Sequence, residues 1–218
     1  LGGCGSEEAA RKLKIGGKTW EQIVAEGQKA GELPATISVI RTYACPRRGD
    51  RGVNATQVNG VDGTRARDLT RAELEGRRQA AAVLEFLRKH APGYENAYLS
   101  LMPAVVGVRE TRRVLGVEYL DRKDLIAGRR RDDAVVREAN FVIDIHNPAG
   151  EGQAEGLAAR VKPYDIPYGC LVPKTLDGLL LAGRCISGSH DAHASYRVQC
   201  IAMAIGAAAG AAAALAAR

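Results

Sequence analysis

An uncharged run near the C-terminal end constrains this chain more than any other sequence feature. From Val198 to Ala217 no residue is charged, and alanine and glycine supply most of the run. Its length is about what a helix needs to cross a bilayer. Alanine, however, buries too little apolar area for firm insertion. Gly206 and Gly210 also leave one helix face almost without side chains. We interpret the run as a packed helix, with a membrane span as the alternative.

The residues before this run indicate a strand, a polar loop and the start of a helix. LLLAG supplies a short buried strand, Gly183 lets the backbone turn at its end, and a helix is predicted to start near Ser195 or Tyr196. In open α/β sheets, ligands sit beyond the carboxyl ends of strands, where a helix N-terminus offers free N–H groups. The stretch therefore predicts a cofactor site.

Two histidines lie in this predicted loop. His190, Asp191 and His193 could bind a metal, but no third ligand stands at a known spacing. We therefore predict that His190 and His193 face a ligand and that there is no metal site.

The length and charge of the chain narrow its class. The 218 residues suffice for one large domain or two small ones. The net charge is +6, but basic residues alternate with acidic ones, and no basic run has aromatic neighbours. We therefore expect a solvated basic surface and no nucleic-acid partner.

The cysteines and the first residue give two further expectations. Five scattered cysteines without a CxxC pair favour a reducing cytoplasm and give no support to zinc or an iron-sulfur cluster. The chain starts with Leu1 and has no signal-peptide pattern, so it looks like a piece that is either cut from something longer or matured by processing.

Local patterns predict the elements of the N-terminal half. Thr19 and Gln22 form a capping box that predicts a helix from about Trp20 to Ala30. ATISVIRTYAC and VNATQVN read as a hairpin. A second helix is predicted in LTRAELEGRRQAAAVLEFLRKHAPG, with Thr70 as N-cap and Glu73 completing a capping box. Its apolar face is expected to consist of Leu74, Ala81, Leu84 and Leu87.

Further apolar runs predict strands in the rest of the chain. They are AYLSLMPAVVGV, VLGVEYL, FVIDIHNP, YDIPYGCLVP and DGLLLAGR, with a short helical piece at DRKDLIAGRR. The predicted class is α/β, with an α+β portion of mixed sheet and helices at residues 1–148, a loop or linker at 149–164, and a C-terminal strand-loop-helix segment at 165–218.

Arginines and a histidine at the ends of predicted strands are candidate ligand contacts. Arg109, Arg112 and Arg113 could hold a carboxylate substrate or the anionic edge of a cofactor. A salt-bridged turn that uses Glu110 is the alternative. His146 ends the run FVIDIH, where it could exchange a proton or be structural.

Five segments in the same order resemble a known family. The chain resembles the FAD-dependent oxidoreductase family with the glutathione-reductase type of FAD fold, and it is similar more distantly to the flavoprotein component of heterodisulfide reductase. The segments are VNGVDGTRARDLTRAELEGRRQ, YENAYLSLMPAVVGVRETRRVLGVEYL, IDIHNP, YDIPYGCLVPK and LLLAGRCISGSHDAHASYRVQCIAMAIGAAAGAAAA.

The resemblance implies a flavoprotein with a Rossmann-like FAD domain and an inserted substrate domain. It implies that Gly183, Arg184 and Ser187 face the FAD and that Arg197, Val198 and Gln199 lie near the flavin ring. It further implies candidates for the active-site side of the flavin, namely Arg109, Arg112, His146, His190 and His193.

One departure from the family pattern affects the expected function. No G-x-G-x-x-G turn follows a strand here, so we expect an N-terminal FAD-domain segment to be absent and to be needed as a partner. The leading hypothesis is hydride transfer between a small organic substrate and FAD. The alternative is a non-catalytic scaffold or ligand-binding module that keeps the fold without the cofactor. The sequence does not predict the oligomeric state.

Overall fold

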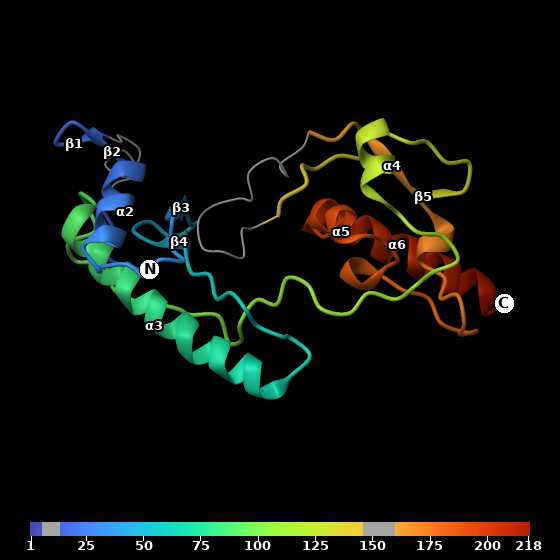
Figure 1. The fold of residues 1–218 in the computed structure, drawn as a ribbon, viewed down its shortest axis with the longest axis horizontal. Coiled ribbons are helices and arrows are strands. Elements are labelled where there is room, and N and C mark those ends of the chain that lie inside the picture. Colours follow the sequence, from blue (N-terminus) through green and yellow to red (C-terminus); the bar gives the residue numbers. More distant parts are fainter. Residues whose placement is uncertain (6–13, 146–159) are drawn as a thin grey trace. The chain divides into compact units, whose positions relative to one another are not determined.

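A computed structural model describes residues 1–5, 14–145 and 160–218 (Figure 1). The chain forms two compact units, of which the first comprises residues 1–109 and the second, among the described residues, 110–145 and 160–218. The predicted linker at residues 149–164 lies mostly outside the described residues, so that boundary stays a prediction. The described chain divides at a different place, between Arg109 and Glu110.

The first unit is built around two helices and a hairpin. Its elements are β1 (Lys14–Ile15), β2 (Lys18–Thr19), α2 (Trp20–Lys29), β3 (Arg41–Ala44), β4 (Arg51–Asn54) and α3 (Ala66–His90). The capping box at α2 is confirmed, because the Thr19 hydroxyl accepts from the Gln22 N–H and the Gln22 side chain accepts from the Thr19 N–H. β3 and β4 pair antiparallel as the predicted hairpin. Each strand is shorter than its apolar run.

Helix α3 departs from its prediction at its start and along its face. It begins at Ala66, and Thr70 lies inside it and donates its hydroxyl to the Ala66 carbonyl at 3.0 Å, so the predicted N-cap is wrong. A threonine inside a helix can bond its hydroxyl to the carbonyl four residues back, and Thr70 does so because the helix already starts at Ala66. Leu84 and Leu87 are buried as predicted, whereas Leu74 and Ala81 are exposed. The buried side chains of α3 are Ala72, Gln79, Val83, Leu84, Phe86 and Leu87.

The second unit packs two helices on a short irregular sheet. Its elements are α4 (Arg122–Ala127), β5 (Ala134–Ala139), β6 (Tyr164–Pro167), η1 (Tyr168–Cys170), η2 (Gly183–Cys185), α5 (His190–Tyr196) and α6 (Gln199–Ala216). β5 and β6 pair antiparallel with register shifts, one of which precedes Ala139. Glu138 beside it adopts a left-handed φ of 55°, as a bulge residue does.

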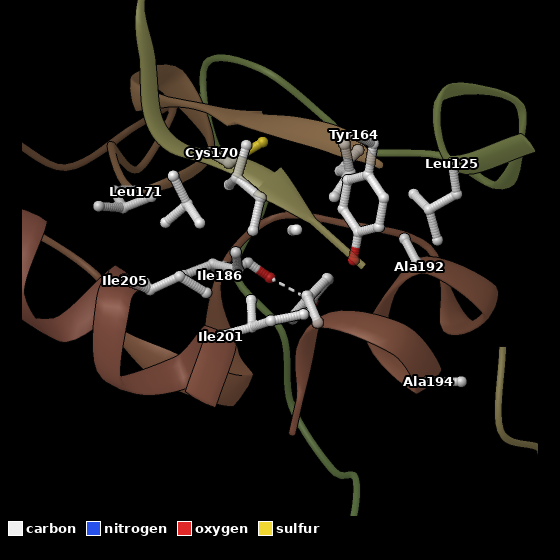
Figure 2. Packing of buried hydrophobic residues seen from close by; sticks show 14 of the residues in the cluster. Leu125, Tyr164, Cys170, Leu171, Ile186, Ala192, Ala194, Ile201 and Ile205 are labelled. Atoms are coloured by element: carbon white, nitrogen blue, oxygen red, sulfur yellow. Dashed lines mark hydrogen bonds between the residues drawn. The ribbon is translucent and has the colours of Figure 1, made fainter. Parts of the chain in front are cut away.

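The core of the second unit lies between this sheet and helices α5 and α6. Figure 2 shows Tyr164, Cys170, Leu171, Ile186 and Ile205 among its packed side chains. All five are fully buried. The segment before α5 and the N-terminal half of α6 are therefore held in place by apolar packing.

Several predicted strands are not strands in the described residues. The runs AYLSLMPAVVGV, VLGVEYL and DGLLLAGR form at most isolated bridges, such as Gly116 with Pro173 and Leu120 with Gly188. The alternation in VLGVEYL is real, because Leu115 and Val117 are exposed while Gly116 is buried. It reflects an extended segment without a continuous ladder. Residues 141–145 of FVIDIHNP are also outside any strand, and the remainder of that run lies outside the described residues.

The sequence predicted one helix starting near Ser195, but the structure has two helices here. His190 and His193, which were predicted to lie in a loop, belong to the first of them. α5 begins at His190 and α6 begins at Gln199, with Ser189 capping α5 through its hydroxyl. The described residues thus form a mixed α/β structure whose sheets are small and antiparallel. The Rossmann-like arrangement stays a prediction.

Helix α6 is long and apolar enough to cross a membrane, judged by length and composition alone. Only 17% of its 18 residues are buried within the structure. Mostly buried core helices of soluble proteins pass the same test of length and composition, and the membrane span stays the alternative interpretation of this run.

Gly27 of α2 and Gly76 of α3 differ in their surroundings, and this difference tests the packing of α2 on α3. A Cβ at Gly27 would overlap the Phe86 ring, whereas a Cβ at Gly76 would meet no atom within 4 Å. Alanine in a helix interior is favoured over glycine by about 1 kcal/mol. We predict that Gly27→Ala lowers the free energy of unfolding by about 1–3 kcal/mol through overpacking.

The matched control is Gly76→Ala, which is expected to raise that free energy by about 1 kcal/mol because it gains helix propensity without a clash. Urea titrations followed by circular dichroism measure both changes. Equal effects of the two substitutions would contradict the close packing of Gly27 on Phe86.

Candidate functional site

A carboxylate joins the arginine-rich segment to helix α5 in the second unit. Glu110 Oε2 lies 2.6 Å from His190 Nδ1 and 3.7 Å from His193 Nδ1, and Glu110 also pairs with Arg113. Arg113 Nε donates to the Gly188 carbonyl at 2.9 Å, next to the start of α5. These four side chains, Glu110, Arg113, His190 and His193, are called the Glu110 cluster below.

The two histidines of this cluster lie in different environments. The His190 side chain is 57% exposed, whereas that of His193 is only 2% exposed and lies edge-on to the Tyr196 ring. Burial lowers the pKa of His193 to about 3, and the nearby positive charges of Arg113 and Arg197 add to this effect. His193 is therefore a neutral ring, and His190 is the more exposed histidine of the two.

The N-cap residue of α6 has no side chain that can cap the helix. Val198 occupies this position and makes no side-chain hydrogen bond to the first turn, which begins at Gln199. Arg197, one residue earlier, is held by Asp144 through bonds of 2.7 Å to the carboxylate and 3.1 Å to the carbonyl. An open first turn carries a partial positive charge and suits an anionic or electron-rich ligand.

Ser187 is a buried hydroxyl without a hydrogen-bond partner among the described residues. It precedes Gly188 and Ser189, the N-cap of α5, and its backbone N–H donates to the Cys170 carbonyl at 3.0 Å. A buried polar group that lacks a partner is costly unless a ligand or water supplies one. Ser187 is therefore consistent with a contact to a bound cofactor.

The glycine at the turn has a conformational role. Gly183 has a φ of +74°, and a Cβ there would meet no atom within 4 Å. The turn thus needs glycine because of its backbone angle, and not because neighbouring atoms crowd it. The side chain of Arg184, the next residue, belongs to an exposed residue of η2.

The structure brings together only part of the predicted catalytic set. His190 and His193 meet at Glu110, and Arg112 is exposed in the same unit. Arg109 belongs to the first unit, so it is not placed relative to the cluster, and His146 lies outside the described residues. Glu110 and Arg113, both named from the sequence, complete the cluster, and their ion pair is the salt bridge at Glu110 that was the alternative interpretation of this segment. The sequence signal for Glu110 was its position as the single acid in RETRR.

The sequence predicted no metal site. Histidine, cysteine, aspartate and glutamate are the side chains that could form one. In the ranges 1–5, 14–145 and 160–218, no group of three or more histidine, cysteine, aspartate or glutamate side chains has an arrangement that could hold a metal ion.

Comparisons with known proteins give one match. A family model described as FAD dependent oxidoreductase matches residues 9–218. Neither the curated proteins nor the solved structures contain a match to this chain.

Burial of His193 leads to a prediction about pH. Its folded-state pKa of about 3 lies below the ordinary value of 6.5, so the unfolded chain binds more protons between these values. The stability that His193 contributes is therefore complete above about pH 6.5 and is lost as the pH falls toward 3. We expect His193 to stay neutral from about pH 8 to about pH 5 in histidine nitrogen NMR.

The same titration has a thermodynamic counterpart. Between about pH 6.5 and about pH 5, the wild-type protein should lose up to about 2 kcal/mol more unfolding free energy than His193→Leu, which cannot titrate there. A His193 ring that gains its proton near pH 6.5 would contradict its burial beside Arg113.

Proposed function

Because this chain belongs to the FAD dependent oxidoreductase family, we propose that it transfers a hydride between a small organic substrate and FAD, with the Glu110 cluster on the substrate side. The family implies FAD as the cofactor and indicates oxidoreductase activity. Two observations in the second unit carry this proposal. The Ser187 hydroxyl is buried and has no hydrogen-bond partner among the described residues, and the first turn of α6 is not capped by its N-cap residue, Val198.

The residues proposed to hold FAD fit its chemistry. The Ser187 hydroxyl can hydrogen-bond a polar edge of the cofactor, and the N–H groups at Val198 and Gln199 can stabilise negative charge. Gly183 allows the turn that leads to Ser187, and Arg184 offers an exposed cation beside it. Arg197 is already bound to Asp144, so we assign it the role of fixing the start of α6.

The proposed substrate side is a proton-holding pair. Bound FAD supplies two-electron chemistry, in which substrate oxidation gives a hydride to the flavin and a proton to a base. His190, exposed and hydrogen-bonded to Glu110, is proposed as the group that takes or returns this proton. Arg113 positions Glu110 by pairing with it. The neutral, buried His193 ring lies on the interior side of Glu110. Arg112, exposed in the same segment, is the candidate for binding an anionic substrate.

The uncovered face of α6 supports a further part of the proposal. A Cβ at Gly206 or Gly210 would meet no atom within 4 Å, so this face is open to close packing. We propose that a segment carrying the G-x-G-x-x-G turn packs there and completes the FAD site. With all five cysteines free, we also propose a cytoplasmic location.

The FAD site can be tested through the backbone angle of Gly183. Valine at a φ of +74° is strained, and we expect Gly183→Val to lower the FAD content of the protein purified from its full reading frame at least severalfold. The matched control is Gly178→Val, because Gly178 has a φ of +72° and equally open surroundings but is not one of the proposed site residues. The flavin absorption band per protein measures FAD content.

The same spectra separate the oxidoreductase from a non-catalytic scaffold. Dithionite should bleach the flavin band of the wild-type protein. A folded protein that lacks a bleachable band would contradict the proposal and favour the scaffold. Equal FAD loss in both valine variants would contradict the specific role of Gly183.

A further inference from the structure

The first unit contains a cavity of about 490 Å³ that the proposed flavin site does not use. One wall is a single face of α3, and the others are the β3–β4 hairpin and the segment 99–107. The helix wall consists of Ala72, Glu73, Gly76, Arg77, Ala80, Val83 and Leu84. Small-molecule sites in proteins commonly enclose about 300–1,000 Å³, so this cavity is large enough for such a ligand.

The walls of the cavity are mainly aliphatic. Beside the helix face they include Val53, Leu99, Leu101, Met102 and Val105, and no aromatic side chain lines the cavity among the described residues. Such a lining has no flat platform for a stacked ring and suits a saturated, aliphatic ligand body.

Polar bonds from α3 hold the segment 99–107 in place. The Glu73 carboxylate accepts from the Val106 N–H, and the Arg77 guanidinium donates to the Ala104 carbonyl at 3.5 Å. Arg77 and Glu73 also pair with each other at 3.3 Å. These two charges of the cavity wall are therefore mutually neutralised.

Two charged lining residues, Asp50 and Arg51, stand outside this pair, and Arg51 is the buried one. It is 7% exposed, and its guanidinium donates to the carbonyls of Asp50 at 2.8 Å and Gly5 at 3.2 Å. Both acceptors are neutral, and no carboxylate of the described residues, that of Asp50 included, lies within ion-pair distance of it. A buried cation without an anion is costly, because neutral dipoles replace only part of its hydration. A ligand anion in the cavity would supply an ion-pair partner that none of the described residues supplies.

We propose that this cavity binds a small carboxylate with an aliphatic body. The carboxylate pairs with Arg51, whose planar guanidinium matches two carboxylate oxygens, and the body lies against Gly76 and Ala80 of α3. The proposal goes beyond the oxidoreductase function and does not depend on FAD.

Calorimetric titration of the whole protein with three probes tests the assignment. Octanoate carries both the anion and the chain, octanol carries the chain alone, and acetate the anion alone. We expect octanoate to bind more tightly than either. Arg51→Met should weaken octanoate binding at least about tenfold, because hydrogen bonds to charged groups are stronger than those between neutral groups. It should leave octanol binding unchanged. Arg48→Met, an exposed arginine of the same hairpin, is the control and should leave octanoate binding unchanged.

A second variant keeps the test independent of any folding defect at Arg51. Gly76→Leu places a side chain in open space toward the cavity, and we expect it to abolish octanoate binding, whereas Gly76→Ala should retain it. Thermal unfolding of each variant confirms folding. Undetectable octanoate binding to the wild-type protein, or equal binding by wild type and Gly76→Leu, would overturn the proposal. Equal loss of octanoate and octanol in a folded Arg51→Met would overturn the role of the charge.

Discussion

The second unit depends on Tyr164 and Asp165, two neighbouring buried residues of β6 whose side chains lie on opposite faces of the strand. The Asp165 carboxylate is fully buried and accepts from the Glu138 N–H at 2.9 Å, the Arg131 N–H at 3.2 Å and the Arg130 guanidinium at 3.0 Å. Burial alone raises the pKa of Asp165, but these bonds outweigh it and hold the pKa below its usual value. The carboxylate thus stabilises the bulge of β5.

The residue before it links the sheet to the helix that carries the histidines. Successive residues of a strand point to opposite faces. The Tyr164 hydroxyl lies 2.9 Å from Ser195 Oγ, which donates to the Phe141 carbonyl at 2.5 Å. Burial raises the pKa of Tyr164 to about 12, so the hydroxyl keeps its proton as a donor. This contact fixes α5, and α5 in turn presents His190 and His193 to Glu110.

Local features of the sequence were sufficient where a contact spans only a few residues. The Thr19 and Gln22 capping box, the β3–β4 hairpin and the helical piece at α4 were all predictable, because each depends on neighbouring residues. Thr70 and Glu73 show the limit of the same rule. They match a capping box in sequence, but Glu73 instead bonds Val106, which lies 33 residues away.

The sequence by itself determined the uncharged C-terminal helix, the turn glycine at position 183 and membership of the family, because composition, backbone angles and segment order are local or linear properties. Only the tertiary structure decided that His190 meets Glu110 across 80 residues, that Arg197 is held by Asp144, and that the Ser187 hydroxyl is buried without a partner among the described residues. The physical reason is that hydrogen bonds and burial depend on which distant segments pack together. Apolar periodicity does not specify that pairing. It therefore predicted strands where the chain is extended but forms only isolated β-bridges.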